Sequence, residues 1–209
     1  LVKRRAARRD LRPDWLGEPD IVDLEVAART VHGELYGPAF AGLIRFAAET
    51  GMRPGELFAL RWEDIDAEAG AVYVRRAADS KTRTVGPTKN GRERVAVMSP
   101  AAHNAALAAR LFNNQALVFT TPTGKQLWQP SHSVLWKPVK TAADRPDMDF
   151  YELRHYCATR LLEAGVSDAD VAVALGHTDG GELVRRVYGH PAERHSLDRV
   201  RDAMKRRAA

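Results

Sequence analysis

The stretch that decides the fold reads Thr50-Gly51-Met52-Arg53-Pro54-Gly55-Glu56-Leu57. Helical patterns lie on both sides of it, and Gly51 is expected to end the first helix. Pro54 starts the second, because proline is well tolerated at the first helical position. Proline also pushes Arg53 into an extended conformation, beside the free N–H groups of the new helix. A guanidinium there suits a phosphate, and Glu56 could hold it in place. An ordinary surface pair of arginine and glutamate explains the same residues.

Outward from this stretch, the apolar spacing predicts a mainly helical domain. Short strands interrupt the helices at residues 72–74, 82–85 and 94–98, with Asn90-Gly91 as a hairpin turn, and residues 118–120 look extended. The expected helices cover residues 21–32, 40–49, 54–62, 100–111, 130–143, 152–164, 168–175, 181–188 and 191–205. The predicted fold class is therefore mainly α with a small antiparallel β-sheet (α+β).

The composition fits one globular domain. The chain has 209 residues, of which 44% are hydrophobic and 28% charged, so wholesale disorder is excluded. No apolar stretch approaches the roughly 18 residues that a bilayer requires. The single cysteine, Cys157, can form neither an internal disulfide nor a cysteine-based metal cluster, which fits a reducing compartment. The start, Leu1-Val2-Lys3-Arg4, is unlike a secretory signal and reads as the middle of a longer gene product.

The charge distribution points to a polyanionic partner. The net charge is +5 and the isoelectric point about 9.5. Basic residues gather at 3–12, 75–94 and 194–207, whereas residues 56–68 and 163–182 are acidic. This segregation predicts one side that faces phosphate and one that faces solvent. Solvated helix faces and a frayed basic terminus would produce the same runs.

Two further motifs carry a cation. Lys89 lies at the edge of the expected hairpin turn, where it could enter a groove and donate a proton, although most lysines at hairpin tips are only solvated. Arg154 lies near the start of the helix 152–164. The apolar stripe of that helix, Leu153, Cys157 and Leu161, places Arg154 off the centre of the buried face. The turn to the next helix resembles a helix-turn-helix, which is weak evidence alone.

Two more motifs lie toward the end of the chain. Gly176 is expected to cap a helix in the left-handed conformation, and His177 follows it, close to unsatisfied carbonyls. That place favours an imidazole that is protonated or donates hydrogen bonds. A lone histidine there is more often structural. Tyr188 follows Val184 and Val187, so it could simply complete an apolar stripe.

In this order along the chain, the five motifs resemble the tyrosine recombinase (phage integrase) family. The similarity runs from about Asp20 to Ala203 and is carried by residues 50–62, Thr88-Lys89-Asn90-Gly91, Leu153-Arg154-His155, Leu175-Gly176-His177 and Tyr188-Gly189-His190. The resemblance implies an enzyme that cleaves and rejoins DNA strands in site-specific recombination or integration. It also implies a prokaryotic or phage origin and a cytoplasmic, nucleoid-associated location.

The resemblance assigns a role to each matched residue. Tyr188 would attack a phosphodiester and form a 3′-phosphotyrosyl link, while Lys89 would protonate the departing 5′-hydroxyl. Arg53 and Arg154 would clamp the phosphate oxygens, and His177 would hydrogen-bond the same phosphate. Glu56 matches the family's supporting acidic position. The expected DNA contacts outside this set are Arg75, Arg76, Arg83 and Arg92.

Two departures from the family pattern stand out. Tyr151 occupies the place, three residues before Arg154, where the family usually has histidine, and we expect it to assist rather than act as an acid. His177 and Tyr188 are eleven residues apart, about two more than is common in the family. Gly180-Gly181 is a plausible joint for that extra length.

The resemblance also predicts the domain organisation and the partners. Residues 1–19 would be a basic linker from an N-terminal core-binding domain, and residues 20–209 the catalytic domain. The partners would be double-stranded DNA and further copies of the chain, as a tetramer on synapsed DNA, with no membrane, no cofactor and no metal. Three other functions stay open: a recombinase-like module that binds DNA without cutting it, a type IB topoisomerase, and a helical protein that does not bind nucleic acid.

Overall fold

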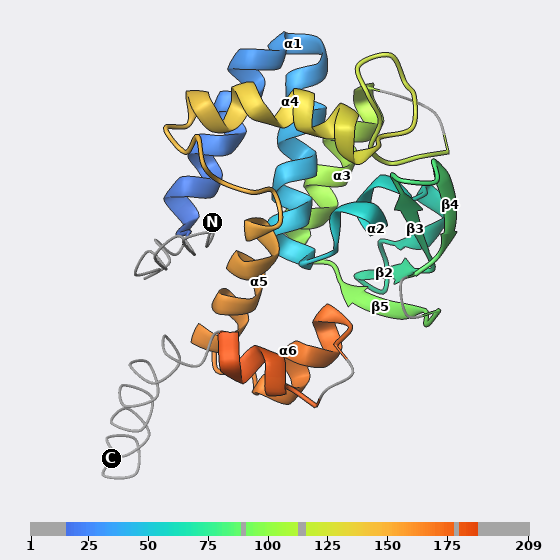
Figure 1. Ribbon diagram of the computed structural model, residues 1–209, viewed down its shortest axis with the longest axis vertical. Coiled ribbons are helices and arrows are strands. Elements are labelled where there is room, and N and C mark those ends of the chain that lie inside the picture. The colour runs from blue at the N-terminus through green and yellow to red at the C-terminus, as the bar shows by residue number, and fades with distance from the viewer. Residues whose placement is uncertain (1–15, 89–90, 113–115, 178–179, 188–209) are drawn as a thin grey trace, which may run out of the picture.

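Two helical arms that fold back on each other form the centre of the molecule (Figure 1). The structure, a computed structural model, describes residues 16–88, 91–112, 116–177 and 180–187. Helix α1 covers Glu18–Thr50 and contains Gly33 at φ 71° and ψ −179°, outside the helical range. The two helices predicted at residues 21–32 and 40–49 are thus confirmed as the two arms on either side of this glycine, and Arg45 of the second arm pairs with Glu18 and Glu25 of the first.

Helix α3 (Pro100–Phe112) packs closely along the second arm of α1. Its buried face consists of alanines, at positions 102, 105, 106 and 109. A Cβ at Gly42 of α1 would lie 2.4 Å from the carbonyl oxygen of Ala105, so only glycine permits this approach. Small residues on both helices therefore set the distance between their axes.

Short strands form two antiparallel sheets beside the helices, where the sequence predicted one small sheet. In the described residues, β1 (Ile65–Asp66), β2 (Ala71–Val74) and β5 (Arg94–Val97) make a three-stranded sheet in the order β1-β2-β5. Strands β3 (Arg76–Asp79) and β4 (Thr84–Pro87) make a separate pair. Strand β3 was not predicted, because Arg-Ala-Ala-Asp carries neither β-branched nor aromatic side chains.

The remaining described helices surround this framework. Helix α2 covers only Pro54–Phe58, shorter than predicted, and a 3₁₀ turn, η1, follows at Trp62–Asp64. Helix α4 (Gln129–Ala142) crosses α1 near the bend at Gly33, while α5 (Glu152–Glu163) and α6 (Asp168–Leu175) lie on the side where α1 begins and ends (Figure 1). Residues 182–187 are also helical. The mainly helical fold with small antiparallel sheets is confirmed. Across the described segments, every helix is too short or too polar to cross a membrane.

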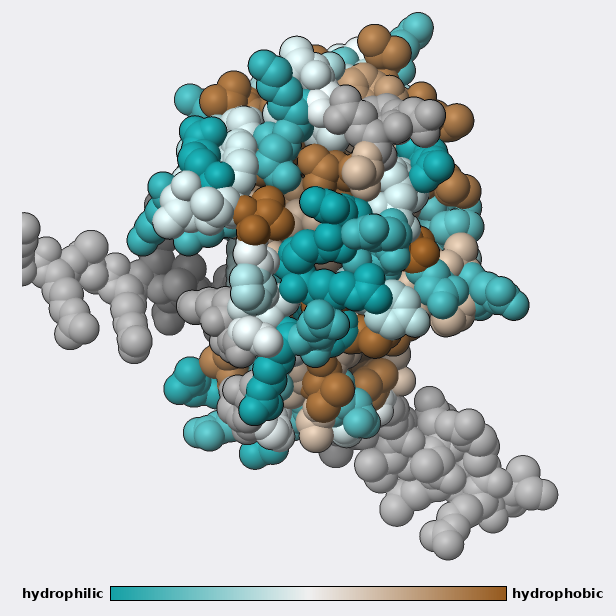
Figure 2. Space-filling view, turned by 90° about the vertical axis from the view of Figure 1, so that its right-hand side faces the viewer, coloured by the Kyte–Doolittle hydropathy of each residue, from teal (hydrophilic) through white to brown (hydrophobic). Residues whose placement is uncertain are grey.

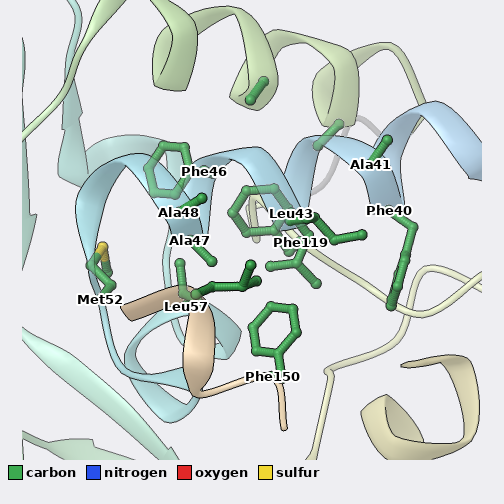
Figure 3. Close-up of a cluster of buried hydrophobic side chains, with 14 of the residues drawn as sticks. Phe40, Ala41, Leu43, Phe46, Ala47, Ala48, Met52, Leu57, Phe119 and Phe150 are labelled. Atoms are coloured by element: carbon green, nitrogen blue, oxygen red, sulfur yellow. The ribbon is translucent and has the colours of Figure 1, made fainter. Parts of the chain in front are cut away.

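The core joins the elements that carry the sequence motifs. Figure 3 shows side chains of α1, among them Leu43 and Ala47, on the side of Leu57 of α2 and of Phe150, which precedes α5. The rings of Phe46 and Phe119 lie 5.4 Å apart, edge to face. Because Phe150 is buried in this cluster, the chain immediately before Tyr151 and α5 is anchored to the core.

Candidate active site

The Arg53 motif folds as the sequence predicts. Gly51 caps α1 in the left-handed conformation, and Arg53 is extended at φ −70° and ψ 149° ahead of Pro54. The backbone N–H of Arg53 donates to Oε2 of Glu56 at 2.8 Å, and its Nη1 donates to Oε1 at 3.1 Å. The carboxylate of Glu56 therefore holds both the backbone and the side chain of Arg53.

Glu56 is not part of a solvent-facing acidic side, contrary to the prediction for residues 56–68. It is 4% exposed, and its Oε2 also accepts a hydrogen bond from Nη2 of Arg94 at 2.9 Å. Asp64, in the same acidic run, is 2% exposed. Both carboxylates can be buried because arginines pair with them. The acidic run in the sequence therefore did not predict whether these two residues face solvent.

Arg154 lies deeper in the protein than predicted. The expected stripe put it off the centre of the buried face, yet it is 2% exposed. Its Nη1 donates to the carbonyl of Gly51 and its Nη2 to the carbonyl of Leu175, both at 2.6 Å. These two carbonyls terminate α1 and α6, so the guanidinium satisfies helix-end acceptors and can be buried without a carboxylate of its own.

His177 meets Arg154 through a turn that glycine makes possible. Gly176 ends α6 at φ 71° and ψ 42°, as predicted, and the N–H of His177 donates to the carbonyl of Ala172 at 2.8 Å. Nη2 of Arg154 lies 2.9 Å from Nε2 of His177. On the same turn, the carbonyl of Gly176 accepts from Nη2 of Arg53 at 3.4 Å. Arg53, Arg154 and His177, which are far apart in sequence, thus converge on one turn.

The cluster carries more positive than negative charge. Burial lowers the pKa of Arg154 to about 10, and the charge of Arg53 acts in the same direction. Burial also lowers the pKa of Arg94, again with Arg53 adding to the effect and Glu56 opposing it. Among the described residues of this cluster, Arg53 and Arg94 share the carboxylate of Glu56, whereas neutral carbonyls hold the guanidinium of Arg154. Such an arrangement attracts an anion.

Tyr151 lies at the edge of this cluster. It is 37% exposed, its ring is 5.3 Å from that of His155, and it is close enough to influence the pKa of Arg154. Its backbone N–H donates to Oδ1 of Asp149 at 2.8 Å. The phenol is therefore placed beside the arginine while remaining accessible from solvent.

Lys89 and Tyr188 lie outside the described residues, but residues near them in the sequence are described. The hydroxyl of Thr88, just before Lys89 in the sequence, donates to the carbonyl of Arg92 at 2.6 Å. Val184, in the helical segment before Tyr188, is fully buried against α5 and α6. Gly181 is packed against the backbone of Asp168, which fixes one half of the predicted Gly180-Gly181 joint.

The predicted DNA contacts of the basic run do not join the cluster. Arg75 and Arg76 both pair with Asp64, at 3.0 Å and 2.7 Å. The guanidinium of Arg83 lies over the ring of Trp128, 5.7 Å from its centroid, and Arg92 is exposed. Figure 2 shows hydrophilic side chains gathered over the middle of the face that the sheets present. Whether these arginines contact DNA stays a prediction.

Comparison with known proteins identifies the class. Residues 25–195 match the Phage integrase family, and the chain belongs to that family. The integrase of Mycobacterium phage FRAT1 is 32% identical over 142 residues, which is 63% of this chain and 43% of that protein. Prophage integrase IntR of Escherichia coli is 27% identical over 214 residues, 89% of this chain and 49% of that protein. The chain therefore spans less than half the length of these two relatives.

The fold is also found among solved structures. The Tn1549 transposon integrase, solved in complex with a circular intermediate DNA, superposes with a TM-score of 0.73. The match covers 88% of this chain and 65% of that one, at 15% sequence identity. The similarity establishes the fold of a tyrosine recombinase catalytic domain.

Sequence reasoning missed Arg94 as a member of the cluster. The sequence feature that could have revealed it is the alternation of side chains in the predicted strand 94–98. Arg94 lies on the same side of this strand as Ala96 and Met98, which are both buried. A charged residue at an inward position requires a buried partner. Glu56 is that partner, and the distance of 38 residues between them in sequence hid the pair.

Proposed function

We propose that this chain is the catalytic domain of a site-specific tyrosine recombinase, which cleaves and rejoins double-stranded DNA through a 3′-phosphotyrosyl link to Tyr188. The observation that carries the proposal is the convergence of Arg53, Arg154 and His177 on one turn, with an excess of positive charge. Membership of the phage integrase family supports it. Residues 20–209 would form this domain, and residues 1–19 a basic linker.

The two arginines would bind the phosphate in different ways. Arg53 sits at the start of α2, where Glu56 holds it, with 29% of its side chain exposed. Arg154 is held by backbone carbonyls, which leave its charge uncancelled. Nε2 of His177, now in contact with Arg154, would exchange that contact for a phosphate oxygen. Donors fixed in advance around a developing charge are often the largest source of catalysis.

The nucleophile would depend on this charge. A free tyrosine has a pKa near 10, so only about 0.1% is phenolate at neutral pH. As the phenol of Tyr188 releases its proton to water and its oxygen bonds to phosphorus, the bond to the 5′-oxygen breaks and Lys89 supplies a proton to that oxygen. The covalent link conserves the phosphodiester, so a 5′-hydroxyl can attack it, rejoin the DNA and release Tyr188. No cofactor is needed for this exchange.

The test is an adduct assay that does not require the natural target to be known. Duplexes nicked near a randomised segment release a short strand on cleavage and trap the covalent product. We expect an SDS-stable protein–DNA adduct with the wild-type chain and none with Tyr188→Phe. Tyr73→Phe is the control, because Tyr73 lies on β2, outside the cluster. An adduct of wild-type yield with Tyr188→Phe would overturn the assignment.

A recombinase-like module that binds DNA without cutting it is the second candidate, and Tyr151 is the observation that favours it. Its phenol offers one hydrogen bond near Arg154 but no positive charge at pH 7. Under our proposal Tyr151 assists, so the wild-type chain cleaves. If the wild-type chain does not cleave DNA and the Tyr151→His variant does, the binding module is favoured instead.

The proposed function also implies the partners of this chain. DNA would run across the cluster, with Arg83 and Arg92 among its backbone contacts, and copies of the chain would assemble as a tetramer on two synapsed duplexes. Because phosphate contacts release counterions, affinity for DNA should fall steeply as salt rises. Arg75 and Arg76 should contribute less to that salt slope, since both are already paired with Asp64.

A further inference from the structure

We propose that Arg94 is a positioning residue of this site, which fixes Arg53 through Glu56 and fixes the His177 turn by packing on Gly176. The inference rests on the proposed function, because it explains how the phosphate-binding groups are held. Arg94 lies on β5, and its side chain is 13% exposed. None of the sequence motifs or family matches described above assigns it a role.

The first link runs through Glu56. Its two carboxylate oxygens bind Arg53 from one side, at 2.8 Å and 3.1 Å, and Arg94 from the other, at 2.9 Å. A carboxylate bound from both sides cannot turn away from Arg53. Arg94 therefore determines the direction in which the Arg53 guanidinium is presented.

The second link is steric. A Cβ built at Gly176 would lie 2.5 Å from both Cδ and Nε of Arg94. The stem of Arg94 thus rests directly against the backbone of the turn. That turn presents the Gly176 carbonyl to Arg53 and the His177 ring to Arg154. One side chain consequently touches the supports of all three groups.

Packing alone does not account for an arginine at this place. A buried ion pair usually contributes less stability than apolar side chains of similar volume. Nε and Nη1 of Arg94 are buried, and no acceptor for them lies within the described segments. The charge of Arg53 further disfavours a second cation here. A buried charge that lowers the stability of the fold is expected at a functional site, where it contributes to function instead.

The experiment is a double-mutant cycle with Arg94→Gln, Glu56→Gln and both together. The rate of single-turnover cleavage is measured at saturating DNA, with DNA affinity measured separately. If Arg94 acts through Glu56, Arg94→Gln lowers the rate about tenfold alone, and by less than about threefold when Glu56 is already glutamine. Additive losses would mean that Arg94 acts independently of Glu56 and would overturn the link through Glu56, whereas an unchanged rate would overturn the whole proposal.

Matched variants separate positioning from charge and from folding. Arg29→Gln removes one charge from α1 and should leave the rate unchanged. Arg94→Lys keeps the charge but not the planar guanidinium group, and its rate should lie between those of Arg94→Gln and wild type. If Arg94→Gln does not fold in urea titrations, Gly176→Ala replaces it, since the new methyl displaces Arg94. Gly70→Ala is its control, with a similar φ of 60°. Equal rates for the two glycine variants would contradict the proposal.

A second readout distinguishes failure of this inference from failure of the proposed function. Inorganic phosphate should raise the Tm of the wild-type chain, and Arg94→Gln should reduce that rise much more than Arg29→Gln does. A wild-type chain that forms no adduct would refute the proposed function. An equal phosphate response in the two variants would refute the role of Arg94, whether or not DNA is cleaved.

Discussion

Replacing His132 by leucine should remove a steep acid sensitivity of the fold. His132 is 1% exposed in α4, and neither of its ring nitrogens has a hydrogen-bond partner among the described residues. Its ring is 4.3 Å from that of Phe150 and 5.1 Å from that of Phe58, centroid to centroid. Burial lowers the pKa of His132 from 6.5 to about 3, and the charge of Asp149 only partly opposes this effect.

The direction and size of the effect follow from linkage between protonation and folding. The pKa is lowered in the folded state, so the unfolded chain takes up the proton first. The stability is present above pH 6.5 and is lost as the pH falls toward 3. Between pH 7 and pH 5, the loss from this one group is about 2 kcal/mol, at about 1.4 kcal/mol per pH unit once the unfolded histidine is charged.

The assay is urea unfolding of wild type and His132→Leu at pH 7, 6 and 5. Subtracting the two unfolding free energies at each pH cancels the other titrating groups, and pH 5 stays above the ordinary pKa values of carboxylates. The leucine variant should gain about 2 kcal/mol relative to wild type between pH 7 and pH 5. A difference that stays constant over this range would refute the account of His132 as a buried neutral histidine.

Three further predictions concern the packing around the site. Gly42→Ala places a methyl 2.4 Å from the Ala105 carbonyl oxygen and should lower the free energy of unfolding by about 1–3 kcal/mol in urea titrations. Asp64→Asn leaves Arg75 and Arg76 without their shared carboxylate and should cost about 1–3 kcal/mol in the same assay; an unchanged value would contradict its structural role. Burial raises the pKa of Cys157 to about 12, so a disulfide reagent at pH 8 should label the native thiol at least about 100 times more slowly than the urea-unfolded one.

The sequence predicted local features best where one residue type determines the backbone. Gly51 and Gly176 cap their helices in the left-handed conformation, and Pro54 opens α2, all as expected. These outcomes depend on the sterics of glycine and proline, which act within a few residues. Helices α3 to α6 were also predicted to within a few residues, because their apolar spacing is clear.

The parts that the sequence did not predict depend on partners that are distant in sequence. Arg154 is buried because the carbonyls of Gly51 and Leu175 accept its hydrogen bonds, and neither is visible from its own helix. Glu56 and Asp64 were expected at the surface for the same reason, since their arginine partners lie on strands. A pattern of residue types reports hydrophobicity, whereas the burial of a charge depends on what is opposite to it.

The way in which each arginine is held determines the charge that the site offers. Arg154 is bound by neutral carbonyls, so its charge is not cancelled, while Arg53 and Arg94 divide the single charge of Glu56 between them. Burial lowers the pKa of Arg154 and of Arg94, and the charge of Arg53 lowers both further, which is a cost that the folded chain carries by itself. A bound phosphodiester would relieve this cost, because its negative charge is attracted to all three guanidiniums. The electrostatic cost that disfavours the empty cluster therefore strengthens its affinity for an anion. A phosphate that gains negative charge in the transition state would be stabilised more than the phosphate of the ground state.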